Sequence, residues 1–252
     1  MDILVKYTDF NKTLSQLKNE IRNEQYYRYY RSLPRTTIFG SNRDTMEIDN
    51  SEGGRNEYYG VEPMNYIFYG LMKKHQRIPH WQEYVSTYIS YYCRQVDDTH
   101  MTFKSNEHHL QYVFETKKLE FKLIRAYMSF LKEVYVLFYL YEKGLHNIYY
   151  SMEMDLRGFD ITAINRYGSM FGIRIYCKTD NANNLADQKT QSRIRLPEGS
   201  TSIKLQADIT QDKRIALGDT YIFSDSTLNS IYHYINNNIQ INYDTGRKEE
   251  YQ

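Results

Sequence analysis

The chain has 252 residues and an almost balanced charge, with 32 Lys+Arg against 31 Asp+Glu. Its length allows one large domain, or a domain of about 150 residues with a smaller one. The charge balance excludes a uniformly basic surface, so any nucleic-acid site must be a local patch.

Three further features bear on the location of the protein. The longest strongly apolar run, residues 134 to 141, is much shorter than the roughly 20 residues of a membrane span. The first residues show no basic stretch followed by an apolar core. Cys93 and Cys177 belong to no metal-binding pattern and indicate reduced thiols. We therefore expect a cytoplasmic protein with no membrane partner.

The N-terminal region has the pattern of helices. Apolar residues recur at helical spacing within residues 10 to 31 and stop ahead of Pro34. Residues 35 to 62 are polar and rich in glycine, which predicts a long loop. The 27 tyrosines are unusually many, and most rings of this kind add buried area to a core.

Two helices joined by a short turn are expected next. The first begins near residue 64, and the second begins near Pro79, a residue suited to a helix start. The junction is basic, with Lys73, Lys74 and Arg77. The pair is compatible with a helix-turn-helix that contacts DNA. A helical hairpin whose charges are only solvated is the commoner source of this pattern.

A long helix is expected over residues 110 to 143, with Gly144 capping its C-terminal end. Its second half is apolar nearly all round, which predicts a central place in the core. Glu133 lies in this half, on one polar stripe with Arg125 and Ser129.

From residue 146 the apolar period changes from about 3.6 to about 2. The pattern predicts the order strand, strand, strand, helix, strand, strand, helix. We therefore predict an α+β fold, with a helical region over residues 1–109 and a mixed sheet flanked by helices over residues 110–252. The strands are expected near 148–154, 158–164, 171–178, 202–209 and 219–223, and the helices near 182–193 and 226–237.

The hairpin formed by the second and third strands places two charged groups together. If its turn centres near Gly168 and Ser169, antiparallel pairing sets Asp160 opposite Lys178, on one face of the sheet. An aspartate can hold a divalent metal while a lysine orients water or stabilises charge on a phosphate. The same pair is also consistent with an ordinary exposed ion pair.

The order of elements carries a resemblance. A helix with internal Glu133 precedes the strand "GFDITAI", the hairpin leads to "GIRIYCKT", and a basic helix "LADQKTQSR" follows. Over about residues 119 to 237 this order resembles the PD-(D/E)xK superfamily of restriction-endonuclease-like nucleases. The resemblance implies that Asp160 and Glu133 hold a metal, that Lys178 is the catalytic lysine, and that Lys189 and Arg193 touch phosphate.

The sequence departs from the family pattern at Tyr176, which occupies the position of a Glu or Gln two residues before the lysine. A neutral phenol is a poor ligand for Mg²⁺, so the second carboxylate would have to come from Glu133, Glu153 or Asp155. The resemblance implies an endonuclease that uses Mg²⁺ or Mn²⁺ and cuts DNA, with double-stranded DNA favoured. It would act in a defence system, phage or mobile element, as a homodimer or within a larger complex.

Two alternatives remain open at this point. The first is a nuclease-like domain that has lost catalysis and binds DNA or a protein partner, which the tyrosine at position 176 favours. The second is an α+β interaction module with no role on nucleic acid, since a fold does not dictate a function.

Overall fold

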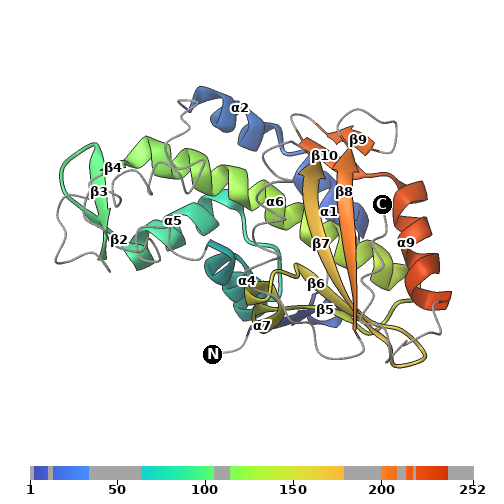
Figure 1. The fold of residues 1–252 in the computed structure, drawn as a ribbon. Coiled ribbons are helices and arrows are strands. Elements are labelled where there is room, and N and C mark those ends of the chain that lie inside the picture. Colours follow the sequence, from blue (N-terminus) through green and yellow to red (C-terminus); the bar gives the residue numbers. More distant parts are fainter. Residues whose placement is uncertain are drawn as a thin grey trace. The chain divides into compact units, whose positions relative to one another are not determined.

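The computed structural model divides into two compact units (Figure 1). The sheet unit comprises Met1–Arg22 and Leu131–Gln252, and the helical unit comprises Asn23–Phe130. These units do not coincide with the predicted division at 109/110, because the N-terminal residues join the sheet and one long helix is shared by both units. The structure describes residues 3–10, 14–33, 64–104, 114–178, 200–208, 214–217 and 220–237.

A five-stranded mixed sheet forms the centre of the sheet unit, in the order β1-β5-β6-β7-β8. Neighbouring strands pair antiparallel from β1 to β7, whereas β7 and β8 pair parallel. The predicted α+β class is therefore confirmed. The strands are β1 (Leu4–Lys6), β5 (Ile148–Ser151), β6 (Ile161–Ile164), β7 (Met170–Lys178) and β8 (Thr201–Asp208).

Three details of the strands differ from the prediction. β1 was not predicted, because three residues are too few to show an alternating period. The strand expected over 148–154 ends at Ser151, and the short helix α7 (Met152–Leu156) follows, with two carboxylates in its first turn where the helix dipole favours them. The last predicted strand pairs outside the main sheet, as β10 (Thr220–Phe223) with β9 (Arg214–Leu217).

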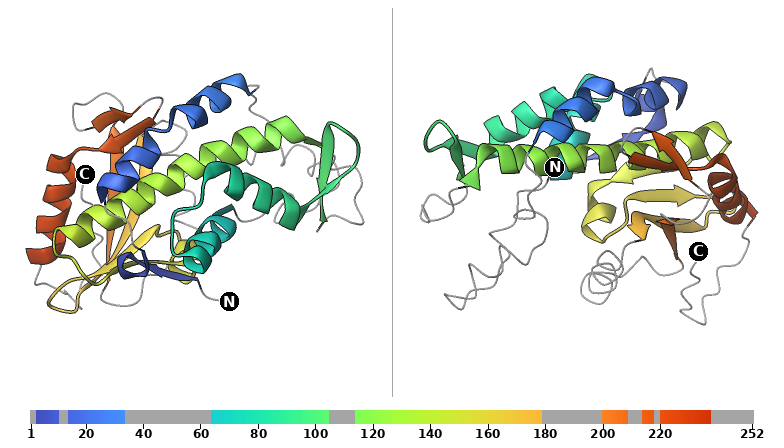
Figure 2. Two further views of the ribbon diagram at one scale, coloured as in Figure 1. Left: turned by 180° about the vertical axis from the view of Figure 1, so that it is seen from behind. Right: turned by 90° about the horizontal axis from the view of Figure 1, so that it is seen from above.

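Helices cover the sheet in this unit. The C-terminal part of α6 (Thr116–Glu142) crosses one face of the sheet (Figures 1 and 2). The apolar stripe of α9 (Asp225–Asn237) is fully buried, and the hydroxyl of Tyr139 on α6 donates to the carbonyl oxygen of Asp225 at 3.2 Å. The second half of α6 is therefore central to the core, as its sequence predicts.

The N-terminal segment is hydrogen-bonded to the end of α6. After β1 comes the 3₁₀ turn η1 (Tyr7–Asp9) and then α1 (Leu14–Ile21). One carboxylate oxygen of Glu142 accepts from the Tyr7 hydroxyl at 3.0 Å and from the main-chain N–H of Leu14 at 2.8 Å. These contacts hold residues from opposite parts of the chain in one unit.

The helical unit contains α2 (Glu24–Ser32), α4 (Met64–His75), α5 (Trp81–Tyr92) and the first part of α6. The pair α4 and α5 lies where the sequence predicts two helices. Many tyrosines pack inward, as expected, and Tyr84 and Tyr88 of α5 are fully buried. A small antiparallel sheet completes the unit, with β2 (Cys93–Gln95), β3 (His100–Phe103) and β4 (Phe114–Glu115) in that order.

Two helix predictions in this part of the chain were wrong in their bounds. The helix expected over residues 10 to 31 is broken at Asn23, whose side chain accepts from the N–H groups at the start of α2. The long helix expected from residue 110 begins at Thr116, because the two preceding residues pair with β3 instead. Capping in one case and strand pairing in the other outweigh helical periodicity.

Candidate functional site

The β6–β7 hairpin has a different register from the one predicted. Ile161 lies opposite Ile173, and Thr162 lies opposite Gly172. Continued by one pair on each side, this register sets Asp160 opposite Arg174. The predicted pairing of Asp160 with Lys178 is therefore wrong, since Lys178 lies four residues further along β7, about 13 Å at the rise of a strand.

The turn of the hairpin explains the shift. The main-chain N–H and carbonyl of Asn165 bond to Ser169 O and Gly168 N, both at 3.0 Å. Its side-chain Oδ1 also accepts from the N–H groups of Tyr167 and Ser169, both at 3.0 Å. Gly168 has φ +81°, a conformation that favours glycine. The turn therefore centres on Tyr167 and not between Gly168 and Ser169.

Asp160 immediately precedes β6 and is partly exposed. Its main-chain N–H donates to the carbonyl oxygen of Ile173 at 2.9 Å. Its Oδ2 accepts from the main-chain N–H of Ile175. The carboxylate therefore lies against the β7 main chain, on the side toward Tyr176.

A buried ring fixes the backbone next to Asp160. Phe159 is fully buried, and a Cβ placed on Gly172 would lie 2.4 Å from its ring. The guanidinium of Arg174, itself only 8% exposed, lies 4.8 Å from the centre of the same ring. Glycine at position 172 thus makes room for the phenylalanine that positions the aspartate.

The remaining predicted carboxylates lie on helices. Glu133 of α6 is buried, with 8% of its surface exposed, whereas Arg125 on the same helix is exposed. Glu153 and Asp155 lie on α7 and not on a strand. Glu153 forms an ion pair with Arg157 at 2.7 Å, and Asp155 accepts from the hydroxyl of Tyr150 at 2.9 Å.

Several predicted site residues lie beyond what the structure describes. Tyr176 and Lys178 belong to β7, but only their main chain is described. Lys189 and Arg193, with the predicted basic helix over 182–193, lie outside the described residues, as does the predicted loop over 35–62. Their predicted roles stay predictions.

The described side chains do not fit a Mg²⁺ or Mn²⁺ site. Within the described residues, no group of three or more His, Cys, Asp and Glu side chains is placed to hold a metal ion. One oxygen of Asp160 already accepts from the β7 main chain, and position 176 offers a phenol in place of a carboxylate. Hard divalent cations prefer several carboxylate and water oxygens.

The basic junction of the helical unit is only partly available to a partner. Lys73 and Lys74 are exposed on the last turn of α4. Arg77, by contrast, donates from both terminal nitrogens to Glu83 of α5, at 2.7 and 2.8 Å. This pairing lowers the pKa of Glu83 and fixes the start of α5, where Glu83 also accepts from the N–H of His80. A structural role therefore accounts for Arg77.

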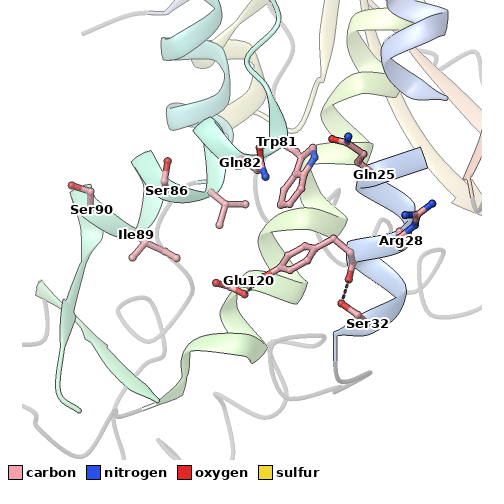
Figure 3. Close-up of a pocket in the computed structure, with 11 residues that line it drawn as sticks. Gln25, Arg28, Ser32, Trp81, Gln82, Ser86, Ile89, Ser90 and Glu120 are labelled. Carbon is pink, nitrogen blue, oxygen red and sulfur yellow. Dashed lines mark hydrogen bonds between the residues drawn. The ribbon is translucent and has the colours of Figure 1, made fainter. Parts of the chain in front are cut away.

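The helical unit also contains a pocket that sequence reasoning missed. Its volume is about 780 Å³, and it lies between α2, α5 and α6 (Figure 3). The apolar periodicity of α5 predicts the residues on one side of the pocket, but no sequence pattern predicts that α2 lies on the other side. The lining residues are Gln25, Arg28, Tyr29, Ser32, Trp81, Gln82, Val85, Ser86, Ile89, Ser90 and Glu120.

Comparisons of the chain with protein-family models, with curated proteins and with solved structures found no match. The resemblance to restriction-endonuclease-like nucleases therefore rests on the residues of this chain and on the order of its elements. Of the helices in the described part of the chain, none is long and apolar enough to cross a membrane.

Proposed function

We propose that the sheet unit is a restriction-endonuclease-like domain that acts on double-stranded DNA, and that its present role is to bind DNA and not to cut it. The observation that carries the proposal is the place of Asp160, at the start of β6 and bonded to the β7 main chain. The resemblance gives this residue the role of the family's metal-binding aspartate.

The order of elements supports the nuclease-like assignment. Helix α6 precedes three antiparallel strands, β5 to β7, and β8 then pairs parallel to β7. A parallel neighbour requires a crossover connection between the two strands, and the basic helix over 182–193 stays a prediction for that connection. A cytoplasmic location and a homodimer or larger complex belong to the same proposal.

Three observations favour binding over cleavage. Position 176 has a phenol where the family has a metal-binding side chain. The register moves Lys178 four residues beyond the level of Asp160. The described side chains do not gather into a metal site.

A metal-dependent endonuclease is the second candidate, and Glu133 favours it. A carboxylate that is only 8% exposed in an apolar helix is uncommon. The resemblance gives a glutamate of this helix a part in metal binding. If this second candidate is correct, Glu133 supplies the carboxylate that position 176 lacks.

One set of variants separates the two candidates. Calorimetric titration with Mn²⁺, a DNA-binding titration at low and high salt, and a plasmid-nicking assay are applied to the parent, Asp160→Ala, Glu133→Gln and Tyr176→Glu. Tyr167→Glu is the matched control, because it adds the same charge at an exposed site in the turn of the same hairpin.

The binding role predicts a parent that binds DNA, with affinity that falls steeply with salt, but does not nick plasmid. Tyr176→Glu then binds Mn²⁺ more tightly than the parent or Tyr167→Glu, because it places a second carboxylate beside Asp160. The endonuclease predicts nicking by the parent that Glu133→Gln and Asp160→Ala both abolish. A parent with no affinity for DNA at low salt would contradict both candidates. The remaining interpretation would then be an interaction module with no role on nucleic acid.

A further inference from the structure

The pocket of the helical unit contains one carboxylate in a defined orientation. Glu120 of α6 lies between α5 and α2 (Figure 3), and its side chain is 16% exposed. Its Oε2 accepts from the Tyr29 hydroxyl at 2.6 Å and from Lys117 Nζ at 2.8 Å. Burial and the bond to Glu120 raise the pKa of Tyr29, so the phenol keeps its proton and remains a donor.

These contacts leave Glu120 with a capacity for one more partner. Both go to Oε2, and Oε1 accepts from no group among the described residues. A carboxylate oxygen accepts hydrogen bonds and cannot donate them. A ligand that fills the pocket is therefore selected for an N–H or O–H donor at this point.

The wall beside Glu120 suits a flat, largely apolar group. Trp81, Val85 and Ile89 of α5 all line the pocket, with Trp81 and Val85 each 7% exposed and Ile89 half-buried. The Trp81 ring is held by stacking on Tyr29, with ring centres 4.9 Å apart and an interplanar angle of 23°. A rigid wall of this kind loses little conformational entropy when it packs against a ring.

The α2 side of the pocket carries a cation. Arg28 is exposed and forms no ion pair with any residue that the structure describes. In Figure 3 its guanidinium points away from Glu120. The pocket therefore separates an acceptor, at Glu120, from a positive charge at its rim, and guanidinium groups bind phosphate well.

We propose that this pocket binds a nucleotide whose base carries an exocyclic amino group. The amino group donates to Oε1 of Glu120, the ring packs on Trp81, Val85 and Ile89, and the phosphate pairs with Arg28. A pocket of about 780 Å³ is within the range of small-molecule sites. The nucleotide is either free or an unpaired residue of a nucleic-acid strand, since both offer the same chemistry.

Trp81 makes the inference directly measurable. It is the only tryptophan of the chain, so intrinsic tryptophan fluorescence reports on this pocket alone. The parent is titrated with adenosine monophosphate and with purine riboside monophosphate, which has a hydrogen atom in place of the amino group and no other N–H on its base. We expect quenching by the first, with an apparent affinity about tenfold or more above that of the second, because a hydrogen bond to a charged group is lost.

Two variants test the two ends of the ligand. Glu120→Gln replaces the charged acceptor by a neutral amide, so its preference for the amino form should be much smaller than that of the parent. Glu115→Gln is its control, as a carboxylate of the same region outside the pocket. Arg28→Ala should bind adenosine and adenosine monophosphate alike, whereas the parent prefers the phosphate form. Arg94→Ala, an exposed arginine of β2, is the control and should keep that preference.

A short single-stranded adenine oligonucleotide identifies the source of the ligand. Quenching by the oligonucleotide indicates a base taken from a strand, and quenching by the mononucleotide alone indicates a free nucleotide. No quenching by either, or equal affinity of the parent for the nucleotides with and without the amino group, would overturn the inference. The test is independent of the proposed DNA-binding role, because no pocket residue belongs to the sheet unit and Asp160→Ala should leave the quenching unchanged.

Discussion

The main-chain N–H of Ile175 donates to the carboxylate of Asp160 and so joins the start of β6 to the middle of β7. We predict that Asp160→Ala lowers the free energy of unfolding by about 2 kcal/mol, the usual range for a hydrogen bond to a charged group. Asp160→Asn keeps a carbonyl acceptor and should lose less. Urea unfolding of the three proteins measures this, and equal losses for Ala and Asn would argue that the bond contributes nothing.

The ring of Phe159 occupies the space where a side chain at position 172 would lie, so Gly172 is required there. Gly172→Ala should lower the free energy of unfolding by roughly 1–3 kcal/mol, because its Cβ would overlap the ring and force it to move. The matched control is Gly168→Ala, where no atom lies within 4 Å and only the positive φ opposes the change.

A double-mutant cycle identifies the cause of the loss at Gly172. Phe159→Leu removes the ring, so the double variant should be more stable than the sum of the two single losses predicts. Additive losses would mean that the alanine acts through the backbone of β7 and not through the ring.

Gln76 follows α4 with φ 51°, a left-handed conformation that a side chain disfavours. We predict that Gln76→Gly raises the free energy of unfolding by about 1 kcal/mol, since glycine adopts this conformation without the steric cost. Lys74→Gly is the control within the helix and should lower it by about 1 kcal/mol. A thermal melt distinguishes the two, and a loss at both positions would contradict the assigned conformation.

The ion pair of Arg77 with Glu83 at the start of α5 should be sensitive to acid. The Arg77 guanidinium lowers the pKa of Glu83 from its ordinary value of 4.5. A carboxyl group with a depressed folded pKa stabilises the fold above its unfolded pKa, and the gain is lost as the pH falls through the folded value.

The free energy of unfolding of the parent should therefore fall more steeply below about pH 4.5 than that of Glu83→Gln. Arg77→Met removes the partner of Glu83, so its free energy of unfolding should also depend less on pH in this acidic range. Stability curves measured by denaturant at a series of pH values check this, and parallel curves for the parent and both variants would show that the pair has no net effect.

The sequence predicts the strands of the hairpin but not how they pair, and the reason is local. Alternation of apolar residues locates β6 and β7 because one face of each strand is buried. It is insensitive to a shift by an even number of residues, which keeps every side chain on its face. The turn decides the register, and "NRYG" has asparagine first and glycine fourth, the pattern of a type I turn. Asn165 was the signal that could have given the observed pairing.

Other features depend on contacts that no local pattern encodes. The three residues of β1 are a strand only because β5 lies beside them. The pocket exists because α2 packs near α5, although a long stretch of sequence separates the two helices. The contact between Phe159 and Gly172 likewise can be inferred only after the register of β6 and β7 is known.

The pairing of Leu4 with Ser151 has a consequence for how the protein is made. A chain emerges from the ribosome from its N-terminus, and domains generally fold as they emerge. The first strand therefore leaves the ribosome without its neighbour, and all of Asn23–Phe130 is synthesised before β5 appears. The sheet unit therefore gains the strand at its edge only when β1, which is made earlier, pairs with β5. A chain stalled before β5 would leave the N–H and C=O groups of Leu4–Lys6 without their partner strand, and unpaired groups of this kind favour aggregation.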